Sequence, residues 1–410
     1  MIRGVLLPAL VAAGLACGLA LPSAANPRPS AEFAVATDAK LEQAGEVVRL
    51  TMALSRPIAF STSVMAGPDR IVIDLPSVNI QVQPGSVRTR AGFASGFRFG
   101  LFSPDRSRIV IDLSQPATVI RAETVPRRGG FADLVVELKR ANRAEFAAAV
   151  RESAAKRPET STTIAEPTRA PGDTRQVVVI DAGHGGIDPG AVVSSIAEKA
   201  VVLAFAQALR DSLSASGRFH VVMTRDDDSF VSLRERVRIA RSAGAHLFLS
   251  IHADSLTQAQ EVRGATVYTG SERATDAESA RLAAKENEAD AVAGLDSTED
   301  IQDVAGILMD LAKRETRTFS SVFARNLVDK LGGSVKMHKV PLRSAGFRVL
   351  SAPDVPSVLI ELGYMSSPKD AELLNSPAWR ARAVTAVHGA IETYFEHVRA
   401  PGGKAAENRQ

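Results

Sequence analysis

The sequence is poor in cysteine and in the larger aromatic residues. Its 410 residues include one cysteine, one tryptophan and three tyrosines. A single cysteine excludes a framework of disulfides as the source of stability. So few tryptophans and tyrosines argue against a carbohydrate site built on stacked aromatic rings. The fold must therefore rest on ordinary apolar cores, and a chain of this length favours two or more domains.

A strong charge imbalance is also missing. The formal net charge is +3, and no tract of arginine and lysine with interleaved aromatic residues occurs. Binding to nucleic acid normally requires a strongly basic face. The sequence therefore predicts that nucleic acid is not a partner.

Long apolar runs are absent except at the amino terminus. A positively charged start precedes an almost wholly apolar stretch over residues 5–21, and Ser23-Ala24-Ala25 has the small residues typical of a cleavage site. We interpret residues 1–25 as a signal peptide, with a transmembrane anchor as the alternative and lipidation of Cys17 as the less favoured third. The sequence thus predicts an exported, periplasmic protein whose mature chain has no membrane span.

Residues 31–140 have the pattern of an all-β domain. The segment Arg70–Leu75 recurs as Arg108–Leu113. We expect a small β-sandwich of two similar halves, in which each sheet contributes one of the two repeated strands. Residues 141–176 lose this pattern and are predicted to be a frayed helix followed by a flexible linker. The predicted strands are VVRLTMAL, RIVIDLP, FRFGLF, RIVIDLS and DLVVELK.

From residue 177 onward, predicted strands alternate with predicted helices. One helix is expected over about residues 198–213, a second begins at Ser232 with a capping-box pattern, and the last runs through residues 379–391. This alternation favours an α/β domain, a largely parallel sheet flanked by helices, over residues 177–397. A disordered tail is expected at residues 398–410. The predicted strands are VVVID, HVVMTR, HLFLSIH, ATVYTG, RVL and VLIEL.

Four reactive side chains lie where these predicted strands and helices begin or end. His184 follows VVVID in a glycine-rich turn, His252 ends HLFLSIH, and Glu361 lies in VLIEL. Glu198 begins the first helix. Reactive residues of a parallel sheet gather at the carboxyl ends of its strands. Since a catalytic zinc takes three such ligands and keeps one position open, we predict that His184, Glu198 and His252 bind one Zn²⁺. Asp181 or a nearby carbonyl is expected to orient a ligand imidazole.

Glu361 is the candidate for proton transfer. It follows the apolar run Val358–Ile360, which should be buried. A buried carboxylate is costly unless it is paired or used. Beside a zinc-bound water it can act as general base and then return the proton to a leaving nitrogen. The alternative is a salt bridge to a lysine or arginine.

The chain resembles a known family at these residues. DAGHGGIDPGAV, AEKAVVL, LFLSIHAD and SVLIELGYMS are similar to the motifs of the zinc-dependent N-acetylmuramoyl-L-alanine amidases of bacterial cell-wall turnover. The resemblance implies zinc binding by His184, Glu198 and His252, and acid/base catalysis by Glu361. It also implies the reaction, hydrolysis of the amide bond between N-acetylmuramic acid and L-alanine in peptidoglycan. Ser367 is a departure, because many members have asparagine there.

The amino-terminal strands resemble a second known domain. RIVIDLP and FRFGLFSPDRSRIVIDL are similar to the AMIN domain. This resemblance implies that residues 31–140 target the protein to the cell wall.

Residues 271–318 form a candidate regulatory insertion. They contain twelve acidic against six basic residues, and Ile301, Val304, Leu308 and Leu311 fall on one helical stripe. Related division amidases carry an insertion here that folds a helix over the zinc until a LytM-type activator displaces it. The resemblance therefore implies an autoinhibitory insertion, with Glu286 or Glu288 as the blocking carboxylate and a LytM-type activator as partner in daughter-cell separation. The alternative is an ordinary solvated helical lid.

Two other functions remain open at this stage. The first is another zinc peptidase of peptidoglycan, such as a carboxypeptidase or an endopeptidase acting on the stem peptide. The second is a non-catalytic adaptor of cell division that binds the cell wall through its sandwich. The presence of all four candidate site residues argues against the adaptor.

Overall fold

The structure is a computed structural model. It describes residues 33–82, 89–103, 105–156, 172–194, 196–255, 261–295 and 307–399. The predicted signal peptide, the linker over residues 157–171 and the tail from residue 400 lie outside these ranges, as do Ile301 and Val304. Within the described residues, no helix combines the length and the hydropathy needed to cross a membrane.

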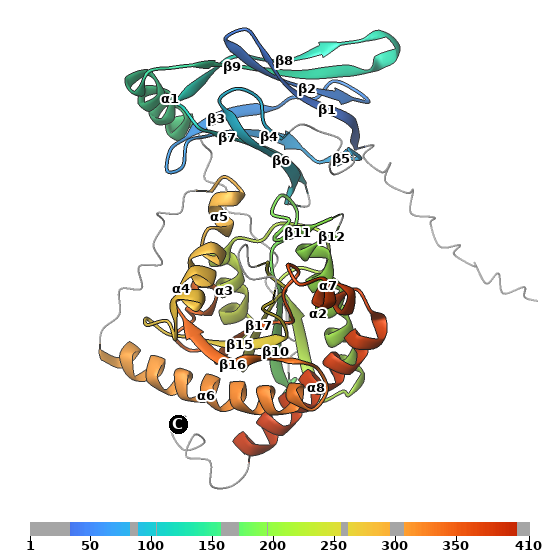
Figure 1. Ribbon diagram of the computed structural model, residues 1–410, viewed down its shortest axis with the longest axis vertical. Helices are drawn as coiled ribbons and strands as arrows, with labels where there is room; N and C mark the ends of the chain where they lie inside the picture. Colours follow the sequence, from blue (N-terminus) through green and yellow to red (C-terminus); the bar gives the residue numbers. More distant parts are fainter. Residues whose placement is uncertain are drawn as a thin grey trace, which may run out of the picture. The chain divides into compact units, whose positions relative to one another are not determined.

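The amino-terminal strands form two sheets that share one apolar core, and all their strand pairs are antiparallel except β1 with β5 (Figure 1). Alternate residues of β2, such as Leu50 and Met52, are fully buried, and they belong to the same core as Ile71 and Ile73 of the other sheet. This alternation is that of strands with one face on a core, and it confirms the predicted all-β fold. The five-stranded sheet has the order β5-β1-β2-β9-β8: β1 Ala34–Ala44, β2 Val47–Leu54, β5 Val78–Ile80, β8 Ala117–Pro126 and β9 Ala132–Arg140. The four-stranded sheet has the order β3-β4-β7-β6: β3 Ser61–Met65, β4 Arg70–Pro76, β6 Ala94–Ser103 and β7 Arg106–Leu113.

The two repeated strands lie side by side in one sheet. The prediction that each sheet holds one of them is wrong, because β4 and β7 are antiparallel neighbours. Antiparallel pairing reverses one copy of Arg-Ile-Val-Ile-Asp against the other, so the arginine of each copy faces the aspartate of the other. Arg70 Nε donates to Asp112 Oδ1 at 2.9 Å, and Arg108 Nε donates to Asp74 Oδ1 at 2.7 Å. The repeat is thus a self-complementary cross-strand pair.

Four strands of this region, β1, β3, β5 and β8, were not predicted from the sequence. The packing of part of the linker as a helix was not predicted either. The strands are short or polar: β3 and β5 have five and three residues, and β8 at the sheet edge is largely exposed. Helix α1, Arg143–Lys156, begins with a capping box in which Asn142 Oδ1 accepts from Glu145 N at 2.9 Å. Phe146 of α1 is buried in the sandwich core, so this helix packs with the β-strands.

The carboxy-terminal region is built on one six-stranded sheet of order β13-β10-β14-β17-β15-β16. All neighbouring strands are parallel except β15 and β17, which are antiparallel. This confirms the predicted largely parallel sheet. The strands are β10 Gln176–Ala182, β13 Phe219–Met223, β14 Leu247–His252, β15 Ala265–Gly270, β16 Met337–Ala345 and β17 Ser357–Glu361. A small hairpin, β11 Val192–Val193 and β12 Ile196–Ala197, lies apart from this sheet.

Helices cover both faces of the six-stranded sheet (Figure 1). Val178 and Ile180 of β10 belong to one core, and Val177 and Val179 belong to the other, as alternation along a strand requires. The first core is completed by α2 Glu198–Ala215, α6 Ile307–Gly332 and α8 Pro377–Arg399, and the second by α3 Leu233–Ser242 and α4 Ala277–Glu286. Shorter elements are α5 Ala289–Val292, α7 Pro368–Leu374, and the 3-10 turns η1 Arg128–Gly130 and η2 Arg348–Leu350.

One edge of this sheet differs from the prediction. The segment RVL was expected to be a strand, but Arg348–Leu350 is the 3-10 turn η2, with Val349 and Leu350 buried in the second core. The strand is instead β16, which pairs only with β15 and contains Pro341. A proline and several polar residues obscure a strand pattern, yet an edge strand tolerates them. The predicted start of α3 at Ser232 is confirmed, because Ser232 Oγ accepts from Glu235 N at 3.2 Å, one of the two hydrogen bonds of a capping box.

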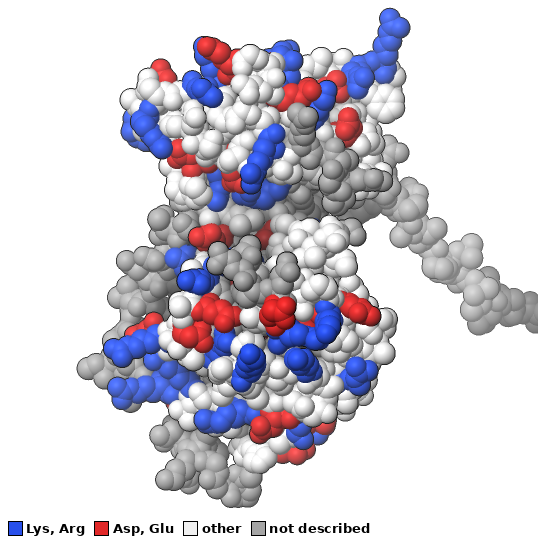
Figure 2. Space-filling view, viewed as in Figure 1, with Lys and Arg blue, Asp and Glu red and all other residues white. Residues whose placement is uncertain are grey.

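The surface carries charges of both signs. On the face that Figure 2 shows, lysines and arginines are interspersed with aspartates and glutamates. Ion pairs occur among the charged residues of the described ranges, such as Arg218 with Glu392 at 2.7 Å and Arg241 with Asp354 at 3.1 Å. This mixed pattern agrees with the small net charge of the sequence.

Candidate metal centre

The six-stranded sheet and α2 deliver the four predicted site residues to one place. His252 ends β14 and Glu361 ends β17, and the two residues are direct neighbours in the parallel register. His184 follows β10, which is the other neighbour of β14. Glu198 is the first residue of α2, and its side chain is fully buried. The structure thus brings together all four side chains at the carboxyl end of the sheet.

The turn that carries His184 has an unusual backbone. His184 has a φ of 59°, the left-handed region that side chains other than glycine rarely adopt. A Cβ at Gly183 would lie 2.5 Å from Cε1 of His252, so only glycine permits this approach. A Cβ at Gly190 would lie 2.7 Å from both Glu198 and His184. The glycines of this turn therefore let the backbone come close to the two imidazoles.

Two imidazole nitrogens and one carboxylate oxygen converge. Glu198 Oε1 lies 3.2 Å from His184 Nε2 and 3.3 Å from His252 Nδ1. Both nitrogens are buried, and neither makes a hydrogen bond within the described part of the chain. Buried polar atoms normally have a partner. These two nitrogens are therefore candidates to donate their lone pairs to a bound group, such as a metal ion.

Glu198 is held in the ionised form. Its Oε2 accepts from Ala191 N at 2.8 Å, and its Oε1 accepts from Ala253 N at 2.8 Å. Burial alone would raise the pKa of Glu198, but the charge of His184 and the contacts to both imidazoles hold that pKa well below its usual range. Glu198 is thus an oriented anion between the two histidines.

Asp188 orients the imidazole of His184, a role that the sequence did not assign to it. Asp188 Oδ2 lies 2.8 Å from His184 Nδ1, which leaves Nε2 to face Glu198. Asp181, the residue expected to do this, lies beneath the turn instead, where it accepts from Ser250 Oγ at 2.7 Å and pairs with Arg236 at 2.5 Å. The signal in the sequence was the position of Asp188, four residues after His184 in the same glycine-rich turn.

Asp188→Asn is expected to weaken zinc binding by about 10- to 100-fold, because the negative charge that fixes the imidazole tautomer is lost. Asp226→Asn, an exposed side chain in the loop after β13, is the matched control and should leave the affinity unchanged. Competition with a chromophoric chelator measures the affinity. Equal zinc affinity in Asp188→Asn and the wild type would contradict the role of Asp188.

Glu361 has one tethered and one free oxygen. Its Oε2 accepts from Asp254 N at 2.9 Å, whereas Oε1 is buried without a hydrogen-bond partner among the described residues. Burial raises the pKa of Glu361 well above its usual range, and the negative charges of Asp254 and Glu198 raise it further. A carboxyl group held this way is suited to pick up and release a proton. No lysine or arginine contact to it supports the salt-bridge alternative in the described ranges.

A fifth side chain, Glu286, enters the same cluster from α4. Its Oε2 lies 3.2 Å from His252 Nδ1 and 3.5 Å from His184 Nε2, and the residue is 5% exposed. The ligand atoms of these three residues lie within 4.8 Å of one another. Glu288, the other candidate, is exposed at the start of α5. Of the two glutamates, the structure brings only Glu286 to the site.

The residues around Glu286 anchor this segment to three parts of the domain. Each contact joins a polar side chain of the segment to a group on another element. The contacts pair Lys285 Nζ with Asp254 Oδ1, Asn287 Nδ2 with Gly346 O (2.8 Å) and Asp290 Oδ1 with Leu233 N (2.9 Å). Glu286 is thus held at the cluster by its neighbours as well as by its own position at the end of α4.

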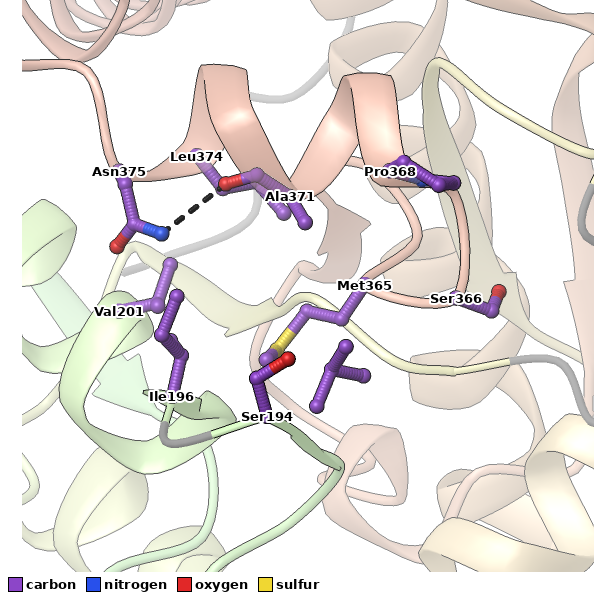
Figure 3. A pocket seen from close by; sticks show the side chains of 10 residues that line it. Ser194, Ile196, Val201, Met365, Ser366, Pro368, Ala371, Leu374 and Asn375 are labelled. Carbon is purple, nitrogen blue, oxygen red and sulfur yellow. Dashed lines mark hydrogen bonds between the residues drawn. The ribbon is translucent and has the colours of Figure 1, made fainter.

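An apolar cavity of about 240 Å³ lies between the β11–β12 hairpin, the start of α2 and α7 (Figure 3). Ile196, Val201 and Met365 contribute apolar side chains to it. None of the four predicted site residues lines this cavity. The cluster itself is closed, since His184 and His252 are only 7% and 5% exposed and Glu198 and Glu361 are fully buried.

Two family models match the chain. The family model described as N-acetylmuramoyl-L-alanine amidase matches residues 178–393, and the AMIN domain model matches residues 38–144. The chain is 31% identical to the N-acetylmuramoyl-L-alanine amidase AmiC of Neisseria meningitidis serogroup B, over 88% of this chain and 89% of that protein. It is 29% identical to AmiC of Escherichia coli O6:H1, over 86% and 87% of the two chains.

A third relative is more similar over a shorter part of the chain. The N-acetylmuramoyl-L-alanine amidase AmiA of Escherichia coli K12 is 38% identical over 54% of this chain and 76% of that protein. The family model covers the region that holds all four converging side chains. The chain belongs to the N-acetylmuramoyl-L-alanine amidase family and has an AMIN domain ahead of its amidase domain.

Proposed function

We infer that this chain is a peptidoglycan N-acetylmuramoyl-L-alanine amidase that uses zinc. The family supplies the bond that is cleaved, the amide between N-acetylmuramic acid and L-alanine. One observation supports zinc binding. His184 Nε2 and His252 Nδ1 are buried without a hydrogen-bond partner in the described part of the chain, and both face one carboxylate oxygen of Glu198.

This donor set fits zinc. Two imidazoles and one carboxylate form a ligand set of catalytic zinc sites, which leave a further position for water or substrate. Zinc held by His184, Glu198 and His252 would supply an electrophile for the substrate carbonyl and acidify the attacking water. The hydrogen bonds that fix Glu198 and the contact of Asp188 with His184 pre-orient two of the three ligands.

Glu361 supplies the proton transfers of the reaction. Its Oε1 has no other hydrogen-bond partner among the described residues, and Asp254 N holds its Oε2 in place. Oε1 takes a proton from the water that attacks the lactyl carbonyl. The same oxygen then donates that proton to the nitrogen of L-alanine, and the stem peptide leaves the glycan. The raised pKa of Glu361 favours holding the proton between these two steps.

We further propose that Glu286 blocks the site in the resting protein. Its carboxylate occupies the side of the imidazole pair that a water and the substrate need, and α4 closes over the cluster. A LytM-type activator would release the block by displacing the segment that contains Lys285, Glu286 and Asn287. The support is the burial of Glu286 and the three polar contacts of its neighbours.

The AMIN domain and the AmiC relatives indicate a location in the cell envelope. We propose the periplasm as that location, reached through the amino-terminal signal peptide, with daughter-cell separation as the process and cell-wall targeting as the role of the AMIN domain. The predicted signal peptide lies outside the described residues.

Product analysis on purified sacculi tests the proposed function. Free stem peptides beside intact glycan chains are the expected products, and a chelator should abolish their release until zinc is restored. Cleavage within the stem peptide would identify an endopeptidase or a carboxypeptidase instead. Binding to sacculi without any released product, even with zinc bound and the Glu286 block removed, would identify an adaptor.

A further inference from the structure

Two buried arginines lie beneath the turn that presents His184. Arg225 follows β13 and Arg236 lies on α3, and they are 4% and 3% exposed. Together they bond to the backbone carbonyls of Ala182, Gly183 and His184, at the end of β10 and in the turn that follows it. These carbonyl groups are inside the protein, where each needs a hydrogen-bond donor.

Arg225 joins this turn to the start of α2. It uses four of the five N–H donors that a guanidinium offers, and each of these four acceptors is a backbone carbonyl. The acceptors are Ala182 O (2.9 Å), Gly183 O (2.8 Å), Lys199 O (2.9 Å) and Asp227 O (2.8 Å). Since Lys199 follows Glu198, this one side chain bonds to the backbone beside two of the three proposed metal ligands.

Arg236 holds the same turn from the α3 side. It too uses four donors, three to carbonyls and one to the buried carboxylate of Asp181. The acceptors are Val231 O (2.9 Å), Ala182 O (2.7 Å), His184 O (2.7 Å) and Asp181 Oδ1 (2.5 Å). The bond to His184 O acts on the residue with a φ of 59°, a conformation that persists only when its surroundings enforce it.

We propose that Arg225 and Arg236 are positioning residues for the metal centre, which set the distance and angle between His184 and Glu198. The proposal rests on the proposed zinc site. The planar guanidinium of arginine has five N–H donors and can bond to several carbonyl groups at fixed angles. The ammonium group of lysine cannot reach the same carbonyl groups. The turn is thereby held in a ligand-ready shape before any metal binds.

Arg225 is the better of the two to test. Removal of Arg236 would leave the buried carboxylate of Asp181 without its cation, and that defect alone destabilises a fold. The four hydrogen bonds that Arg225 makes within the described ranges all go to backbone carbonyls. Burial and the nearby charge of Arg236 lower the pKa of Arg225 to about 10, so this side chain is still charged at neutral pH.

The experiment compares zinc affinity and stability in the full chain. Arg225→Met should weaken zinc binding by about 10- to 100-fold, the range for residues that orient ligands. Arg225→Lys should fall between Arg225→Met and the wild type. Arg238→Met is the matched control, since Arg238 lies on α3 and pairs with Glu235 on the half-exposed side of the helix. Zinc affinity comes from chelator competition, and unfolding by urea is followed for the metal-free and the zinc-saturated forms.

The two forms separate positioning from a purely structural role. Loss of general stability lowers the unfolding free energy of both forms equally and leaves zinc affinity unchanged. If Arg225 positions the ligands, its substitution lowers the unfolding free energy of the zinc-saturated form more than that of the metal-free form. Zinc affinity within about twofold of the wild type in Arg225→Met, or in Arg225→Lys if the methionine variant does not fold, would overturn the proposal. Because zinc binding is the readout, a wild type that binds zinc without amidase activity would contradict the proposed reaction and leave the positioning role in place.

Discussion

Glu361→Gln is expected to bind zinc as the wild type does and to release stem peptides from sacculi about 10²- to 10⁴-fold more slowly. The glutamine side chain has the same shape, and its amide oxygen can still accept from Asp254 N. It cannot take up and return a proton, which is the role assigned to the unpartnered Oε1. The measurement is the rate of stem-peptide release together with the zinc content of each protein.

The comparison is sharpest in a protein without the proposed block. Both Glu361→Gln and its control are therefore placed in the Glu286→Ala background. Glu372→Gln, an exposed glutamate on α7, makes the same chemical change away from the cluster and should not alter the rate. Stem-peptide release by a zinc-loaded Glu361→Gln within about tenfold of its background would rule out Glu361 as the proton carrier.

Glu286→Ala is expected to raise the basal amidase activity without any activator. If the blocked state accounts for 99% of the molecules, its loss raises the rate by about 100-fold. The alanine variant removes the carboxylate that lies 3.2 Å from His252 Nδ1 and leaves the rest of α4 in place. The measurement is dye release from labelled sacculi at equal zinc occupancy.

Glu288→Ala is the matched control for this prediction. It removes a glutamate two residues away that is exposed, so the basal rate should stay at the wild-type level. An unchanged rate in a folded, zinc-loaded Glu286→Ala would show that this carboxylate does not block the site. The point variant is preferable to deleting residues 275–315, because Leu282 and Ala283 of α4 belong to an apolar core and the deletion would expose it.

The metal centre was largely predictable because parallel sheets collect residues in one place. His184, His252 and Glu361 each follow or end an apolar run, and such runs end at the same edge of the sheet. Asp188 was missed because a residue inside a turn has no periodic pattern to mark it. Its contact depends on the left-handed backbone of His184, which only the structure reveals.

Glu286 and Glu288 illustrate what a helical pattern can and cannot decide. A continuous helix would point two residues two positions apart about 200° apart, which predicts that only one of them faces the site. In the structure α4 ends at Glu286, and Glu288 precedes α5. The helical spacing favours Glu286, because Glu286 continues the buried stripe of Ser279, Leu282 and Ala283. The pairing of the two repeated strands was beyond the sequence, because either arrangement places apolar residues inside. The reciprocal contacts of arginine and aspartate decide it in the structure.

The direct pairing of His252 with Glu361 across β14 and β17 places these two side chains on adjacent inner strands of the six-stranded sheet. A slip of one residue between these strands would turn one of the two side chains to the opposite face of the sheet. The imidazole and the carboxylate therefore cannot drift apart while the ladder between the strands persists. Amide hydrogen exchange in β14 and β17 should therefore be slower than in α4, which lies outside the sheet. If α4 is displaced, as the proposed block requires, the placement of His252 beside Glu361 is expected to persist.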